Sequence, residues 1–219
     1  KHRFNVFASA QHINRDSYYG GGQDLNAYGN TTDLNWMAGS QYVYSFGKCI
    51  FMPSDLTAGI EFNQDKLEDN MWGYHRTVDQ KVNIGSAFLQ NEWKNDHWGF
   101  LLGGRLDKHN LIDHIIFSPR ANLRFNPTQN INLRLSYSSG FRAPQAFDED
   151  MHIENVGGTV AMIERAKDLK EEKSQSFSAS ADMYHRFGAF QTNLLVEGFY
   201  TRLTDEFVLG GPFDRGDGV

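Results

Sequence analysis

Apolar and polar residues alternate one by one along much of this chain. Between Leu56 and Asn63, every second residue is Leu, Ala, Ile or Phe, and the residues between them are Thr, Gly, Glu and Asn. The same period of two recurs in residues 34–44, 98–107, 117–126 and 131–138. Successive side chains of a β-strand point to opposite faces, so each stretch predicts a strand with one apolar and one polar face.

The alternation and the turn residues that bound it predict an all-β fold of about nine strands. We expect these strands at residues 2–10, 33–45, 55–64, 80–94, 97–108, 117–126, 131–139, 174–186 and 189–204. A short helix is expected over 159–172, which is rich in Ala, Glu and Lys. The predicted fold is therefore an antiparallel up-and-down meander.

The predicted connections alternate in length. Short turns are expected at 95–96, 126–130 and 186–188, and long polar loops at 11–32, 64–79, 108–116 and 140–173. Short turns at one end and long loops at the other are typical of an outer-membrane β-barrel. The meander is thus interpreted as a segment of a transmembrane barrel, with its polar face toward the lumen.

Aromatic residues, 14% of the chain, gather near the predicted short turns. They are Trp93, Trp98, Phe100, Phe125, Tyr184, Phe187 and Phe190. Such a cluster is expected of the aromatic girdle at a membrane interface, but also of aromatic pairs in any sheet. The alternation of loop lengths favours the girdle.

The composition of the chain excludes some classes of protein. No apolar run of about 18 residues exists, which excludes a helical membrane protein, whereas a mean hydropathy of −0.54 is compatible with barrel strands. The net charge is −6 and no basic stripe is present, so a nucleic-acid partner is not expected.

Cys49, the only cysteine, cannot form an internal disulfide. Residues 1–4 are not a signal segment, so we expect that one was removed or that the chain starts inside a longer protein.

The segments 88–93, 104–107, 118–120, 140–144 and 167–174 form an ordered set of motifs. Together they resemble the C-terminal part of the barrel of TonB-dependent outer-membrane receptors. The family's box at a strand end is matched by Gly140-Phe141-Arg142-Ala143-Pro144. Its next box, NPDL-K-PE-x-S, is approximated by residues 167–174, including Asp168 and Leu169, although Ala-Lys replaces Asn-Pro and Glu replaces the second Pro. The family's FxQDEW, GxRxD and SPR segments resemble 88–93, 104–107 and 118–120, in family order. The version of the first box resembles receptors of Bacteroidetes-type bacteria.

The resemblance implies a fragment of a larger transporter. Receptors of this family have a barrel of about 22 strands and a plug, and residues 1–219 resemble only part of the barrel, without a plug domain. The implied function is import of a ferric siderophore, haem or cobalamin across the outer membrane. The implied partners are that ligand, outer-membrane lipid and the TonB-ExbB-ExbD complex, which would act through the plug; no bound cofactor is implied.

Ligand contacts are expected from the long outer loops, because loops on a rigid scaffold carry recognition. The candidates are His152, Asp148, Asp150, His109 and His114. By resemblance to the family's haem receptors, His152 is a candidate haem ligand, but a lone loop histidine is more often polar surface, and no other metal site is predicted. The acidic run Asp148-Glu149-Asp150 could attract a cationic ligand or calcium, but without the spacing of a calcium loop it more often marks a solvated loop. Residues 140–144 are interpreted as mainly structural, since proline ends a strand ladder.

The polar face of the predicted strands carries charges: Arg105, Arg120, Arg124, Arg134, Glu61, Glu92, Asp107 and Glu197. They are interpreted either as a lumen that contacts plug and substrate or as a charge ladder that satisfies itself. No catalytic motif is present, so an enzyme is not expected. Two other classes stay open: a stand-alone β-sheet that binds a glycan or protein, and a barrel enzyme built on Ser139, His152 and Asp148.

Overall fold

Nine strands form one continuous antiparallel sheet in which each strand pairs with its neighbours in the order β1-β2-β3-β4-β5-β6-β7-β10-β11. The computed structural model describes residues 1–18, 27–146, 153–156, 159–162 and 169–208. The strands are β1 (His2–Tyr18), β2 (Tyr28–Cys49), β3 (Met52–Met71), β4 (Arg76–Lys94), β5 (Trp98–His109), β6 (Ile116–Thr128), β7 (Ile131–Arg142), β10 (Glu172–Phe187) and β11 (Phe190–Thr204). The predicted all-β meander is confirmed.

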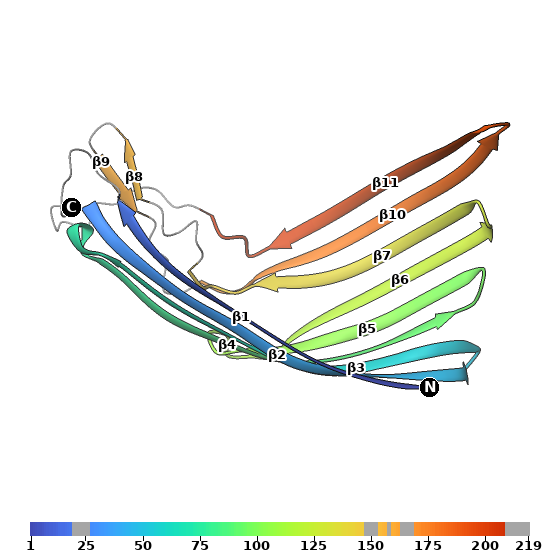
Figure 1. Ribbon diagram of the computed structural model, residues 1–219, viewed down its shortest axis with the longest axis horizontal. Coiled ribbons are helices and arrows are strands. Elements are labelled where there is room, and N and C mark those ends of the chain that lie inside the picture. Colours follow the sequence, from blue (N-terminus) through green and yellow to red (C-terminus); the bar gives the residue numbers. More distant parts are fainter. Residues whose placement is uncertain (19–26, 147–152, 157–158, 163–168, 209–219) are drawn as a thin grey trace.

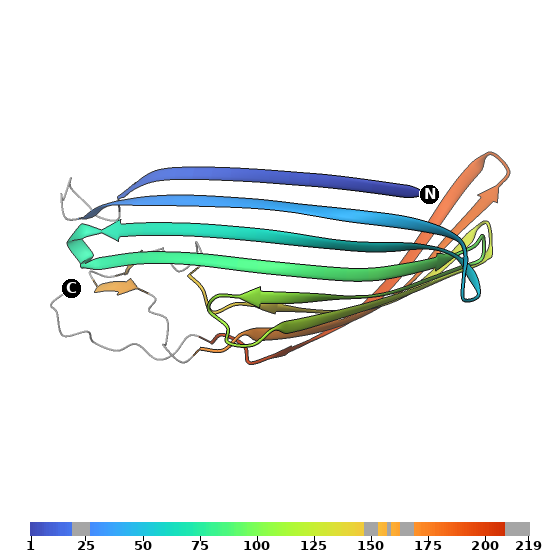
Figure 2. The same cartoon turned by 90° about the horizontal axis from the view of Figure 1, so that it is seen from below.

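The sheet bends into a trough whose strands run side by side (Figures 1 and 2). The connections 50–51, 95–97, 129–130 and 188–189 are short and lie together at the right of Figure 1. The connections 72–75 and 110–115 lie at the opposite end, where β8 (Ile153–Val156) and β9 (Thr159–Met162) form a separate two-stranded sheet. In the part of the chain that the structure describes, no helix has the length and apolar character to span a bilayer.

The first three strands are much longer than predicted, and β4 begins four residues earlier, at Arg76. In the expected loop 11–32, residues 11–18 and 28–32 are strand and residues 19–26 lie outside the described residues. The expected loop 64–79 is largely strand, and β3 and β4 are joined by the 3-10 turn η2 (Trp72–Tyr74) and His75, whose φ is 48°. In these segments the alternation of apolar and polar residues is lost because both faces of the strands are mainly polar. The backbone hydrogen bonds between neighbouring strands nevertheless continue. At ~3.3 Å per residue, 20-residue β3 is about 65 Å long, whereas a barrel's apolar band is about 25 Å tall.

The helix expected over 159–172 is wrong in its first part. Residues 159–162 form strand β9, which pairs with β8. Residues 163–168 lie outside the described residues, and residues 169–171 are irregular. Helix propensity is a weak guide here because pairing with the preceding segment supplies the backbone with hydrogen bonds that propensity ignores.

The two faces of the sheet differ as the alternation predicts. Exposed apolar side chains such as Ile60, Leu102 and Leu135 share one face, which we call the apolar face. Buried polar side chains such as Ser86 and Asp107 lie on the other, the polar face. This arrangement inverts a water-soluble protein, in which apolar residues are interior, and agrees with a barrel wall.

The apolar face ends at a common row across the long strands. On β3 it is apolar up to Phe62 and becomes polar at Gln64, which pairs with Trp36 of β2 and Asn83 of β4. Trp36 Nε1 donates to Gln64 Oε1 (3.3 Å), and Gln64 Nε2 donates to Asn83 Oδ1 (2.7 Å). An indole that is apolar on one side and hydrogen-bonded on the other suits a membrane interface. This row marks the outer limit of the apolar band.

Aromatic rings line the apolar face beside the short turns. Trp98 stacks on Phe125 with ring centroids 4.1 Å apart, and Phe51 stacks on Trp93 at 5.7 Å. The predicted cluster is therefore present, with one correction. Tyr184 lies on the polar face, where its hydroxyl donates to Asp182 at 3.1 Å, because its position in β10 has the opposite parity.

Candidate functional site

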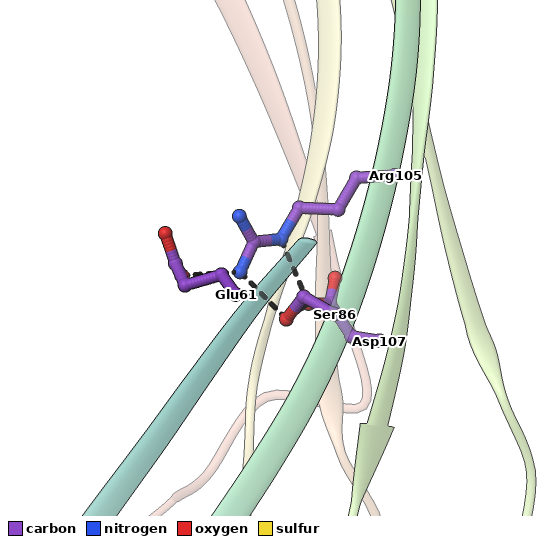
Figure 3. A network of polar contacts seen from close by, with 4 residues as sticks. All are labelled: Glu61, Ser86, Arg105 and Asp107. Atoms are coloured by element: carbon purple, nitrogen blue, oxygen red, sulfur yellow. Dashed lines mark hydrogen bonds and ion pairs between the residues drawn. The ribbon is translucent and has the colours of Figure 1, made fainter. Parts of the chain in front are cut away.

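The polar face holds an ion network that joins strands β3, β4 and β5 (Figure 3). Glu61 of β3, Ser86 of β4 and Asp107 of β5 pair across one row, and Arg105 lies two residues before Asp107. Arg105 Nη2 donates to Glu61 Oε1 (2.8 Å) and Ser86 Oγ (2.7 Å), and its Nε donates to Asp107 Oδ1 (2.8 Å). Ser86 Oγ also donates to Asp107 Oδ1 at 2.6 Å.

Three other arginines that the sequence predicts on the polar face bind local acceptors. Arg120 donates to the side chain of Gln90, Arg124 Nη2 to the backbone oxygen of Asn95 (3.2 Å), and Arg134 Nε to Asn132 Oδ1 (2.7 Å). None of these bonds reaches a carboxylate. Of the predicted charges, Arg105, Glu61 and Asp107 are thus brought into one network, and the remaining arginines are not part of it.

Two carboxyls of the polar face lie beyond the apolar band. Asp65 of β3 pairs with Asn35 of β2. Asp33 lies two residues before Asn35 on the same face, so it is the diagonal neighbour of Asp65. Burial raises the pKa of Asp65 to about 6, and the neighbouring Asp33 carboxyl raises it as well. Two close carboxylates in a partly buried place disfavour a second negative charge. This pair was not among the sequence candidates, because only the register brings the two residues together.

The two candidate histidines of the 108–116 loop point to different partners. His109 is fully buried at the end of β5, with Nε2 3.3 Å from Gln145 Oε1. His114 is exposed, and its Nε2 lies 3.0 Å from the buried carboxylate of Glu171. Lys173 Nζ also contacts Glu171, at 2.8 Å. Burial raises the pKa of the Glu171 carboxyl, but the hydrogen bond from Lys173 opposes it and leaves this pKa below its usual value. The structure places these histidines in loop-anchoring contacts.

The first family box covers the end of β7 and the chain that leaves it. Gly140, Phe141 and Arg142 are still in β7, and Arg142 lies over the Phe207 ring at 5.5 Å. Ala143 is buried against Ile112 and Ile116, with Phe141 packed beside them. Pro144 follows directly after this small core. The box therefore lies where the chain turns off the sheet.

The remaining candidates lie outside the described residues: His152, Asp148, Asp150 and Asp168. Leu169, of the second box, is described and lies shortly before β10. Within the described ranges, no three His, Cys, Asp or Glu side chains are grouped so as to hold a metal ion. Hollows on the sheet surface are lined mainly by apolar-face side chains such as Phe100, Leu123 and Leu135.

Comparison with known proteins identifies the architecture. A family model described as "TonB dependent receptor-like, beta-barrel" matches residues 2–218. The siderophore receptors PirA from Pseudomonas aeruginosa and from Acinetobacter baumannii match 92% of the chain, with TM-scores of 0.64 and 0.61 and identities of 13% and 15%. A variant of the ferric enterobactin receptor PfeA from P. aeruginosa gives 92% coverage, a TM-score of 0.62 and 18% identity.

The chain spans 40%, 39% and 31% of these three solved chains, respectively. At such identities the likeness shows the fold alone. No curated protein matches the chain.

Proposed function

Because the chain belongs to the TonB-dependent receptor-like β-barrel family, we propose that it forms part of the barrel wall of an outer-membrane receptor that imports a ferric siderophore. The resemblance seen in the motifs is confirmed at family level. The observation that carries the proposal is the inverted sheet: an exposed apolar face bounded by aromatic rings and a polar face that holds buried ions. A bilayer outside and a polar lumen inside account for both faces.

The ligand class rests on the structural neighbours. Two are siderophore receptors and one is a ferric enterobactin receptor, so an iron chelate is favoured over haem or cobalamin. Haem would gain support from a ligating His152. We place the ligand at the outer connections, chiefly 143–171, and propose that the TonB-ExbB-ExbD complex supplies energy through a plug outside residues 1–219.

The competing classes require different structures. A soluble binding sheet would not expose a contiguous apolar face that spans several strands, yet Ile60, Leu102 and Leu135 are all more than half exposed. A barrel enzyme would need Ser139, His152 and an acid to converge. Ser139 lies within β7 and pairs with Gln175 of β10, which provides no observation in favour of catalysis. Transport is therefore the function that we propose.

The test uses the whole receptor in its source cells. An antibody to this chain should detect an outer-membrane band well above 25.0 kDa. Cells lacking the receptor should lose uptake of a radiolabelled ferric catecholate while keeping uptake of haem and cobalamin. Replacement of residues 147–168 by a short Gly-Ser linker should weaken chelate binding at least tenfold. A soluble band near 25.0 kDa, or unchanged binding after this replacement, would refute the assignment.

A further inference from the structure

The connection that leaves β7 is tied to β4 by a two-point contact. Ala146 N donates to Gln80 Oε1 at 2.7 Å, and Gln80 Nε2 donates to the backbone oxygen of Ala146 at 3.3 Å. Gln80 and Ala146 are each 6% exposed. A side-chain amide that satisfies both polar groups of one residue, away from water, replaces the strand partner that this backbone lacks.

A second contact ties the same segment to β5. The N–H of Leu111 donates to His109 Nδ1 at 3.0 Å, so the proton of the neutral imidazole lies on Nε2, which donates to Gln145 Oε1. The apolar positions of β5 end at Leu106, so His109 lies beyond the membrane-spanning part of the strand. Burial lowers the pKa of His109, which favours this neutral form.

The direction of the connection follows from the face on which these groups lie. Gln80 and His109 are both polar-face residues. β4 is separated from β7 by β5 and β6 in the sheet, and Ala143 packs against Ile112 and Ile116. Residues 143–146 therefore pass from β7 to β4 over the connection that joins β5 to β6. Lys108 Nζ secures the neighbouring turn by donating to the backbone oxygens of Ile112 (2.6 Å) and Asp113 (2.9 Å).

We propose that Gln80 and His109 are positioning residues that hold the start of the 143–171 connection across the mouth of the barrel. This inference rests on the proposed function, because an incoming ligand would meet this connection at the mouth of the barrel. The contacts that carry it are independent of any ligand. Through these hydrogen bonds Gln145 and Ala146 reach β5 and β4.

The experiment is hydrogen–deuterium exchange on the whole receptor in lipid, because the Ala146 amide reports the contact directly. Gln80→Ala should speed exchange of the peptide containing residues 143–146 at least tenfold. Gln80→Glu keeps an acceptor for the Ala146 N–H and should restore most of the protection. Gln90→Ala is the matched control: it lies on the same strand and face but bonds to Arg120.

A second variant, Gln145→Ala, tests the proposal if Gln80→Ala does not fold. Gln145→Ala removes the His109 contact from the half-buried partner and should speed exchange severalfold. Heat-modifiable gel mobility should show a folded barrel in every variant compared. Unchanged exchange in folded Gln80→Ala and Gln145→Ala would overturn the proposal. Exchange that rises in a receptor that takes up no iron chelate would support the positioning role and count against the proposed ligand instead.

Discussion

Arg105 and Glu61 lie 44 residues apart in the sequence and form an ion pair across an intervening strand, with 2.8 Å between Nη2 and Oε1. The pair bridges β5 to β3 over Ser86 of β4, and Asp107 holds the guanidinium from its other side at Nε. A polar interior needs such links because it has little apolar packing to fix the curvature of the sheet.

Arg105→Met is expected to lower the free energy of unfolding by about 1–3 kcal/mol, a value reduced by the partial exposure of the guanidinium. The loss leaves two carboxylates, Glu61 and Asp107, without their shared cation. Urea unfolding of the receptor in vesicles measures the effect. In a double-mutant cycle with Glu61→Gln, the second substitution should cost less in the Arg105→Met background. Strict additivity of the two effects would contradict a direct pair.

The Asp33–Asp65 pair predicts a pH dependence of stability. The pKa of Asp65 is raised to about 6, above the ~3.9 of an unfolded aspartate. Between these values the folded protein binds more protons, so stability falls as pH rises from about 4 to about 6 and stays lower above it. Asp65→Asn should therefore raise the melting temperature at pH 7.5 and flatten its change over this window.

Thermal unfolding in detergent at several pH values tests this expectation. Asp96→Asn, in an exposed short turn, is a suitable control and should leave the profile unchanged. If the melting temperature of the wild type does not fall between pH 4 and pH 6 relative to that of Asp65→Asn, the pKa of Asp65 is not raised in the folded protein.

Gly59 lies directly under an aromatic ring. Its cross-strand partner is Phe88, and a β-carbon at Gly59 would lie 2.7 Å from Phe88 Cε1 and 2.7 Å from the Ser40 backbone oxygen. Gly59→Ala is therefore expected to destabilise the barrel by about 1–3 kcal/mol, because the ring must move and the backbone cannot. Gly85→Ala, on the neighbouring strand with open space around it, should be nearly neutral. Equal effects in urea unfolding would be inconsistent with this packing.

The fold was largely predictable because period-two alternation follows directly from a strand with one apolar and one polar face. Residues 56–62 show it, and β3 follows. Beyond Gln64 both faces of β3 are polar, so the pattern disappears although the strand continues to Met71. There the strand is held by pairing with β2 and β4, a long-range property that a local pattern does not contain.

The candidate site was predictable only in part. Residues 140–144 were recognised from a motif, and the structure adds what the motif does not contain, namely Gln80 and Glu171 as partners of the nearby segments. Gln80 is one glutamine among several in the sequence, and nothing local distinguishes it. Its importance comes from a bond to Ala146, 66 residues away.

The central claim is that one face of this sheet meets lipid and the other a polar lumen. Leu101 and Leu102 test it most directly, because they are adjacent leucines of β5 on opposite faces: Leu101 pairs with Glu92 and Leu102 with Asn91. In the whole receptor with Cys49→Ser, a spin label would be placed at Leu101→Cys or Leu102→Cys and the protein reconstituted in lipid. We predict that the label at 102 collides readily with oxygen and hardly with an aqueous nickel chelate, and that the label at 101 lacks this lipid signature. The same lipid signature at both positions, or its presence at 101 alone, would contradict the barrel-wall assignment.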